Sequence, residues 1–121
     1  MGYFFWIWLI LILILSSIPN LPVHPKTIIP HVRSDYLIHF IQYFILAALF
    51  VFWRQETYIQ IYKIILLLIA GFLFASADEL HQLIIPGRSL NIKDVISDML
   101  GFFFGFMSAT WWLLISQNKN C

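Results

Sequence analysis

Charged residues and cysteine are both scarce in this chain. Asp, Glu, Lys and Arg make up 11% of its 121 residues, whereas 61% are hydrophobic. Soluble proteins carry about 25% charged residues, so the composition excludes an ordinary soluble domain. The formal net charge of +1 gives no basic face of the kind that nucleic-acid binding requires. With Cys121 as the single cysteine, an internal disulfide and a cysteine metal cluster are excluded.

The hydrophobic residues are gathered in long blocks, which predict membrane-spanning helices. The first block has no charge, and its length as a helix, about 24 Å, is slightly short of a hydrocarbon core of about 30 Å. A signal peptide is the alternative, but no Lys or Arg precedes the block and "SSIPN" is a poor cleavage site. We expect an all-α, polytopic membrane protein of one domain, residues 1–121. Its four-transmembrane-helix bundle has helices near 3–18, 36–53, 58–82 and 94–116.

Proline is confined almost entirely to the first connection, since four of the five prolines lie between residues 19 and 30. Each lacks a backbone donor and disfavours helix before it, so this connection is expected to be extended and outside the hydrocarbon. Four spans place the first and third connections on one side of the membrane, and the second connection and both termini on the other. Basic residues number four and three on these two sides, so the charge bias does not fix the orientation.

Most of the polar residues fall on the side of the first and third connections. The stretch "SADELHQLIIPGRSLNIKDVISDMLG", residues 76–101, holds six of the thirteen charged side chains, and the second helix adds polar residues at the same level. An ionised side chain below the membrane interface costs about 2.5–3.5 kcal/mol, so such residues usually face protein or water and serve a function. We therefore predict a polar ligand-binding pocket lined by Asp35, His39, Asp78, Glu79, Gln82, Arg88, Asp94 and Asp98.

The fourth helix carries a stripe of small and acidic residues on one face. Gly101 and Gly105 form a G-x-x-x-G pair, which lets another helix approach closely. Asp94, Asp98 and Ser108 fall on the same stripe. We expect the two glycines to serve helix packing and to turn Asp98 toward protein rather than lipid.

Three stretches together, "SSIP", "SDYLIHFIQYFILAALF" and "DELHQLIIPGRSLNIKDVISDMLG", give the chain a family resemblance. In order, spacing and membrane context it resembles the VanZ-like family from Ser16 to about Gly105. Members often have Lys where this chain has Tyr36, and Asn where it has Asp98, so the second departure adds an acid inside the bundle. The core of the resemblance is Glu79, Gln82, Pro86, Gly87, Arg88, Asp94, Gly101 and Gly105.

The resemblance implies a small bacterial inner-membrane protein of four spans. It also implies that the polar side faces outward and that both termini are cytoplasmic. The family is named after a member that confers low-level resistance to the lipoglycopeptide teicoplanin. Most members lie outside resistance clusters, so resistance does not follow from the resemblance alone.

Three functions remain open on the sequence. In the favoured one, the lipid-embedded protein binds a lipid-linked cell-wall precursor or a lipoglycopeptide: Arg88 and Lys93 contact phosphate or carboxylate, while His39 and the acids take amine or hydroxyl groups. In the second, the acids act on a lipid headgroup as an enzyme, with or without a divalent metal. Asp78, His81 and Asp94 could then hold the ion.

The third function is structural: a bundle that associates with itself or a partner, in which Arg88 pairs with Glu79 or Asp94 as a clamp. The balance lies against an enzyme, because the sequence has no nucleophile arrangement and no H-x-x-x-H metal signature. We assign no metal ligand and no cofactor. Ion conduction is disfavoured, because the faces below Gln42 and Asp98 lose their polar residues.

Overall fold

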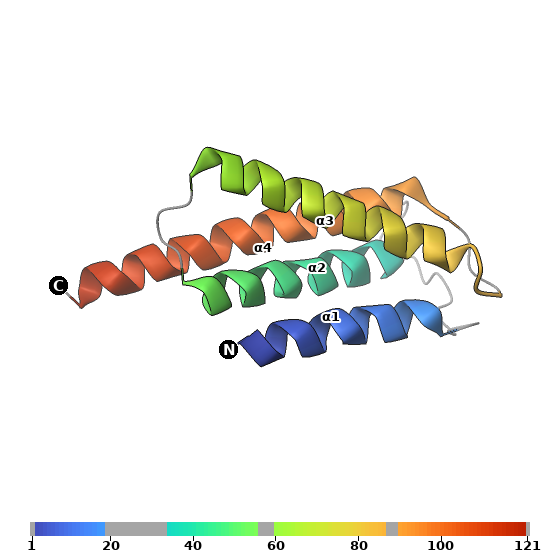
Figure 1. The fold of residues 1–121 in the computed structure, drawn as a ribbon, viewed down its shortest axis with the longest axis horizontal. Helices are drawn as coiled ribbons and strands as arrows, with labels where there is room; N and C mark the ends of the chain where they lie inside the picture. The colour runs from blue at the N-terminus through green and yellow to red at the C-terminus, as the bar shows by residue number, and fades with distance from the viewer. Residues whose placement is uncertain (1, 19–33, 56–59, 87–89, 121) are drawn as a thin grey trace.

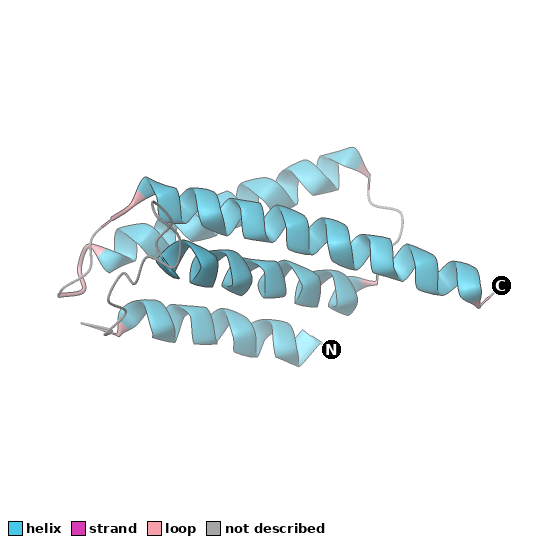
Figure 2. Cartoon of the chain, turned by 180° about the vertical axis from the view of Figure 1, so that it is seen from behind, coloured by secondary structure: helices cyan, strands magenta, loops and turns pink. Residues whose placement is uncertain are grey.

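The computed structural model describes residues 2–18, 34–55, 60–86 and 90–120. These residues form four α-helices and no strand (Figure 2), which confirms the all-α prediction. The helices are α1 (Gly2–Ser17), α2 (Ser34–Arg54), α3 (Ile61–Gln82) and α4 (Ile92–Lys119).

The helix bounds differ from the predicted ones by up to three residues. The third helix begins at Ile61 rather than at 58, because Gln60 has an extended backbone (φ −65°, ψ 143°). The fourth begins at Ile92 rather than at 94, because Asn91 caps it through its side chain, which accepts a hydrogen bond from the Lys93 backbone N–H. Asp94 therefore lies in the first turn and does not begin the helix.

Three of the helices, α2, α3 and α4, are long and apolar enough to cross a membrane, and α1 is a shorter apolar helix. The chain is therefore a membrane protein. Large hydrophobic side chains are exposed along the outer faces of all four helices, where lipid would cover them.

Successive helices run antiparallel (Figure 1). The two termini, the end of α2 and the start of α3 lie together at one end, here called the termini end. The ends of α1 and α3 and the starts of α2 and α4 lie together at the other, here called the polar end. This is the arrangement expected from four spans, and it brings segments about 40 residues apart to the same level.

The closest packing is between α2 and α4. A Cβ atom on Gly101 would collide with the carbonyl oxygen of Phe40, and one on Gly105 with that of Phe44. The glycines thus allow the α4 backbone to lie directly against α2. Ser108 does not continue this face as predicted: it is exposed, and Ala109 occupies the buried position.

The hydrophobic core lies along this contact and is shared by all four helices. Helix α1 is tied to α2 by the Trp8 indole, whose Nε1–H donates to the Gln42 carbonyl oxygen over 2.9 Å. The buried hydrophobic residues are Ile12, Tyr43, Leu46, Ala47, Val51, Ala75, Phe102, Phe106 and Ala109.

Candidate functional site

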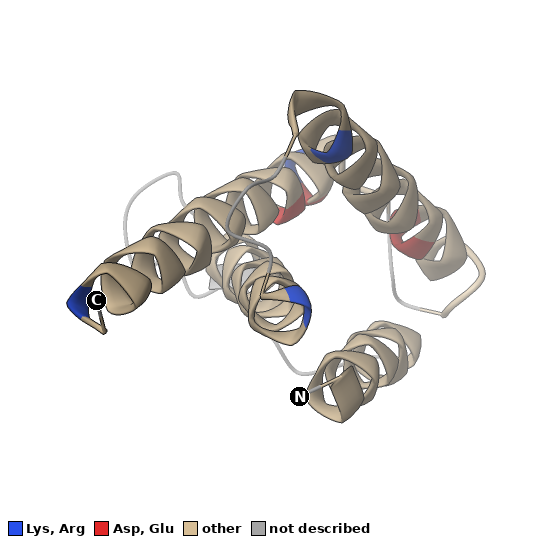
Figure 3. Cartoon of the chain, turned by 60° about the vertical axis from the view of Figure 1, so that its left-hand side comes forward, with Lys and Arg blue, Asp and Glu red and all other residues tan. Residues whose placement is uncertain are grey.

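The buried polar and charged side chains of the described residues gather at the polar end. They lie in the last turns of α1 and α3 and the first two turns of α4. In Figure 3 the acidic positions of α3 and α4 lie away from the marked chain termini. The set consists of Ser16, Asp78, Glu79, Gln82, Asp94 and Asp98. Beyond these turns the buried side chains are mostly apolar, so the candidate functional site lies at the polar end.

His39 of α2 joins this group across the contact with α4. Its Nδ1 lies 2.9 Å from Asp98 Oδ1, a hydrogen-bonding distance. Its Nε2 lies 3.9 Å from Asp94 Oδ2, too far for a hydrogen bond. Asp98 is fully buried, and its bond to Nδ1 fixes the imidazole ring with Nε2 directed toward Asp94.

Glu79 of α3 is connected to the start of α4 by Asn91. The Asn91 backbone N–H donates to Glu79 Oε2 over 3.2 Å, while Gln82 Nε2 donates to Glu79 Oε1 over 3.3 Å. The Asn91 amide also donates to the Tyr36 hydroxyl over 3.4 Å. Asn91 thus links α2, α3 and α4, a role that the sequence analysis missed. The "LN" before "IKD" was the available signal, since Asn is a preferred cap residue.

Asn91→Ala is expected to lower the free energy of unfolding by about 1 kcal/mol, the usual cost of losing an N-cap side chain. Asn91→Ser keeps a cap oxygen but not the reach to Tyr36, so it should retain most of that stability. Thermal unfolding in mild detergent measures both. Equal losses in the two variants would assign the effect to the Tyr36 contact and not to the cap.

A second group of polar atoms lies one turn deeper. The Tyr43 hydroxyl, Asp78 Oδ1 and Asp98 Oδ2 are buried and have no hydrogen-bond partner among the described residues. Buried polar groups are normally hydrogen-bonded, so these atoms are the ones that a bound polar group, ion or water would satisfy.

The structure does not bring every predicted residue to this site. His81 is exposed, and its Nε2 lies 3.0 Å from the Ser17 hydroxyl of α1, so the predicted metal group of Asp78, His81 and Asp94 is not assembled. The Asp35 side chain and the whole of Arg88 lie outside the described residues. The predicted clamp between Arg88 and an acid therefore stays a prediction.

Instead, the site assembles His39, Glu79 and Asp94. Each can offer one metal-ligating atom, and these atoms lie within 4.8 Å of one another. The sequence analysis assigned no metal because no short motif contains the three residues. Only the four-span topology brings His39 to the two acids, which lie 40 and 55 positions along the chain.

The comparison with family profiles matches residues 3–114 to VanZ/LLP1. The chain belongs to the VanZ/LLP1 family. This confirms the resemblance seen in the sequence, and the match includes all of α2 and α3 and most of α1 and α4. The searches of curated proteins and of solved structures find no match.

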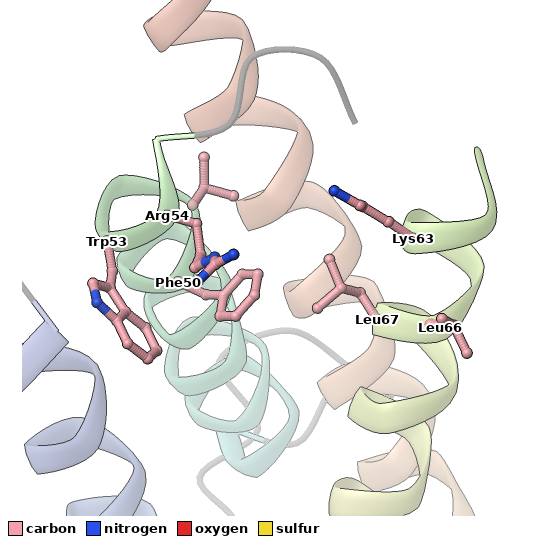
Figure 4. A pocket seen from close by; sticks show the side chains of 7 residues that line it. Phe50, Trp53, Arg54, Lys63, Leu66 and Leu67 are labelled. Carbon is pink, nitrogen blue, oxygen red and sulfur yellow. The ribbon is translucent and has the colours of Figure 1, made fainter. Parts of the chain in front are cut away.

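This VanZ/LLP1 protein also has a cavity at its termini end, with a volume of about 340 Å³. Arg54 of α2 and Lys63 of α3 contribute to its lining, and the other side chains around it are apolar (Figure 4). It is lined by Phe50, Val51, Trp53, Arg54, Lys63, Leu66 and Leu67. The two ends of the bundle thus offer opposite chemistries: buried acids at the polar end, and cations beside an apolar cavity at the termini end.

Proposed function

We propose that this VanZ/LLP1 protein binds the headgroup of a lipid-linked cell-envelope molecule at its polar end. The observation that carries the proposal is the gathering of all six described buried polar side chains at one end of an otherwise apolar bundle. Two of these side chains, Asp78 and Asp98, keep a buried oxygen without a hydrogen-bond partner among the described residues, and leaving such an oxygen without a ligand or water lowers stability. In this proposal the protein lies in the bacterial inner membrane with the polar end outward and both termini in the cytoplasm.

The residues favour a headgroup that donates hydrogen bonds. Asp78 and Asp98 each have a buried oxygen without a partner among the described residues, and carboxylates accept hydrogen bonds from amines and hydroxyls. Sugars and amino groups provide such donors, whereas a bare phosphate does not. Lys93 is exposed at the start of α4 and could contact the phosphate of the same ligand. The apolar outer faces of the helices would lie along its lipid tail.

The proposal predicts selective stabilisation by a sugar-bearing lipid. We expect the thermal stability of the protein in mild detergent to rise with a lipid-linked cell-wall precursor and to change much less with undecaprenyl phosphate. Saturation at about 100 times Kd stabilises a protein by about 2.7 kcal/mol. Asp78→Asn should weaken binding about tenfold, equivalent to about 1.4 kcal/mol, because it removes a carboxylate that accepts from the headgroup.

The control is Thr110→Val in the termini half of α4. The Thr110 hydroxyl is also buried without a partner among the described residues, but it lies three turns from Asp98. This variant should keep wild-type binding. A lipoglycopeptide is tested beside the two lipids. If it alone stabilises the protein, the bound molecule is the drug, which would support a role in teicoplanin-type resistance. Absence of any shift in the wild type would refute headgroup binding and favour the structural bundle.

A further inference from the structure

At the polar end, α2, α3 and α4 bring one imidazole and two carboxylates together, and we propose that His39, Glu79 and Asp94 hold a divalent cation. This inference goes beyond the proposed function and does not depend on it. Glu79 and Asp94 are buried and His39 is half-buried. Their ligand atoms lie within 4.8 Å of one another.

The distances suit a common ion after a small contraction. Two donors that are each about 2.1 Å from one ion lie between about 3.0 and 4.2 Å apart, depending on the angle at the metal. The 3.9 Å between His39 Nε2 and Asp94 Oδ2 falls in this range. Donors of a tetrahedral site lie about 3.4 Å apart, so the widest separation, at most 4.8 Å, would need to shorten by up to about 1.4 Å, which changes of side-chain rotamer can supply.

Asp98 orients the histidine for this role. A metal-bound histidine generally donates its other ring N–H to a carboxylate, which fixes the tautomer and directs the free nitrogen at the metal. The bond from His39 Nδ1 to Asp98 Oδ1, over 2.9 Å, is such a contact. It leaves Nε2 with its lone pair on the side of Asp94.

Buried oxygens one turn deeper than these three residues provide an independent sign of a ligand. Asp98 Oδ2 has no partner among the described residues and its residue is 0% exposed, while Asp78 Oδ1 has none and its residue is 3% exposed. A bound cation would offset the negative charge of the neighbouring carboxylates, and its water ligands could donate hydrogen bonds to these oxygens. Ordinary packing would leave them unsatisfied.

The donor set favours particular metals. One nitrogen and two carboxylate oxygens suit Zn²⁺ or Mn²⁺ better than Ca²⁺, which takes six to eight oxygen ligands. Three protein ligands also leave at least one coordination position open. That position could take an oxygen of a phosphate or carboxylate ligand at the membrane surface.

The test is direct metal binding to the full chain without an affinity tag. Protein stripped with a chelator and kept in mild detergent is titrated with Zn²⁺ and with Mn²⁺ by calorimetry. We expect one equivalent to bind, with affinity rising with pH because bound ligands must be deprotonated. Pulsed electron paramagnetic resonance of bound Mn²⁺ should show coupling to one imidazole nitrogen, and this coupling should disappear in His39→Gln.

Matched variants locate the ion. Asp94→Asn and His39→Gln should each weaken binding at least tenfold, and Asp98→Asn by about 10–100-fold, the usual effect of removing the carboxylate behind a metal-bound histidine. His81→Gln removes the histidine that is exposed among the described residues, and Cys121→Ser removes the single cysteine; both variants should bind metal as the wild type does. Glu79→Gln replaces any variant that fails to give a monodisperse helical protein.

Two results would overturn the proposal. One is a folded wild type that binds neither Zn²⁺ nor Mn²⁺ at millimolar concentration. The other is binding that survives both Asp94→Asn and His39→Gln, whichever residues then hold the metal. Metal binding without lipid binding would keep this inference and remove the proposed function, whereas lipid binding by a protein that binds neither metal would do the reverse.

Discussion

Gly101→Ala is expected to destabilise the bundle, although alanine is the better helix former. The added Cβ would collide with the Phe40 backbone carbonyl of α2, and a backbone yields far less than the end of a flexible side chain. Overpacking typically costs about 1–3 kcal/mol and occasionally more, and alanine regains up to about 1 kcal/mol of helix propensity. We expect a net loss of about 2 kcal/mol. Adding Gly105→Ala, which collides with Phe44, should double it.

Gly71 of α3 provides the matched control. A Cβ there would lie 3.4 Å from the Phe102 ring, an ordinary contact with a side chain. Gly71→Ala should therefore leave stability unchanged or raise it by up to about 1 kcal/mol. Both substitutions are measured by thermal unfolding in the same detergent. Equal stability of Gly101→Ala and Gly71→Ala would show that α4 does not approach α2 as closely as the structure places it.

The helices and their antiparallel order could be predicted because they depend on local properties. Blocks of apolar residues as long as a membrane span have few alternatives to a helix in lipid. With four spans, chain connectivity alone places the starts of α2 and α4 beside the end of α3. The bounds were less accurate, because caps such as Asn91 depend on single side-chain contacts that hydropathy does not report.

The composition of the site was harder to predict than its location. The sequence placed His39 and the acids at one end, but it paired His81 with Asp78 and Asp94 because these residues are close in the chain. The structure directs His81 to Ser17 of α1 and brings in His39 from α2. Helix rotation decides this choice, and rotation is set by packing. On α3 it turns Asp78 and Glu79 inward and leaves His81 exposed, while Gly101 and Gly105 fix the face that α4 turns to α2.

The hydrogen bond between His39 and Asp98 should be the strongest polar coupling between α2 and α4. Asp98→Ala leaves the His39 Nδ1–H without its acceptor in a buried place, and an unsatisfied buried group costs about 1–3 kcal/mol. His39→Ala leaves the fully buried Asp98 carboxyl without its donor. The double variant loses both groups together, so its free energy of unfolding should fall by less than the sum of the two single losses.

We expect a coupling energy of about 1–3 kcal/mol, within the range for residues that share a hydrogen-bond network and above the average of about 0.6 kcal/mol for polar pairs between membrane helices. The unfolding free energies of the wild type, the two single variants and the double variant are measured with chelator present, so that a bound metal does not contribute to this double-mutant cycle. Ser97→Ala combined with His39→Ala is the control. Ser97 precedes Asp98 but bonds to the Lys93 carbonyl of its own helix, so its effect should add to that of His39. An additive result for His39 and Asp98 as well would mean that Asp98 does not hold the imidazole, and would remove the reason for Nε2 to point at Asp94.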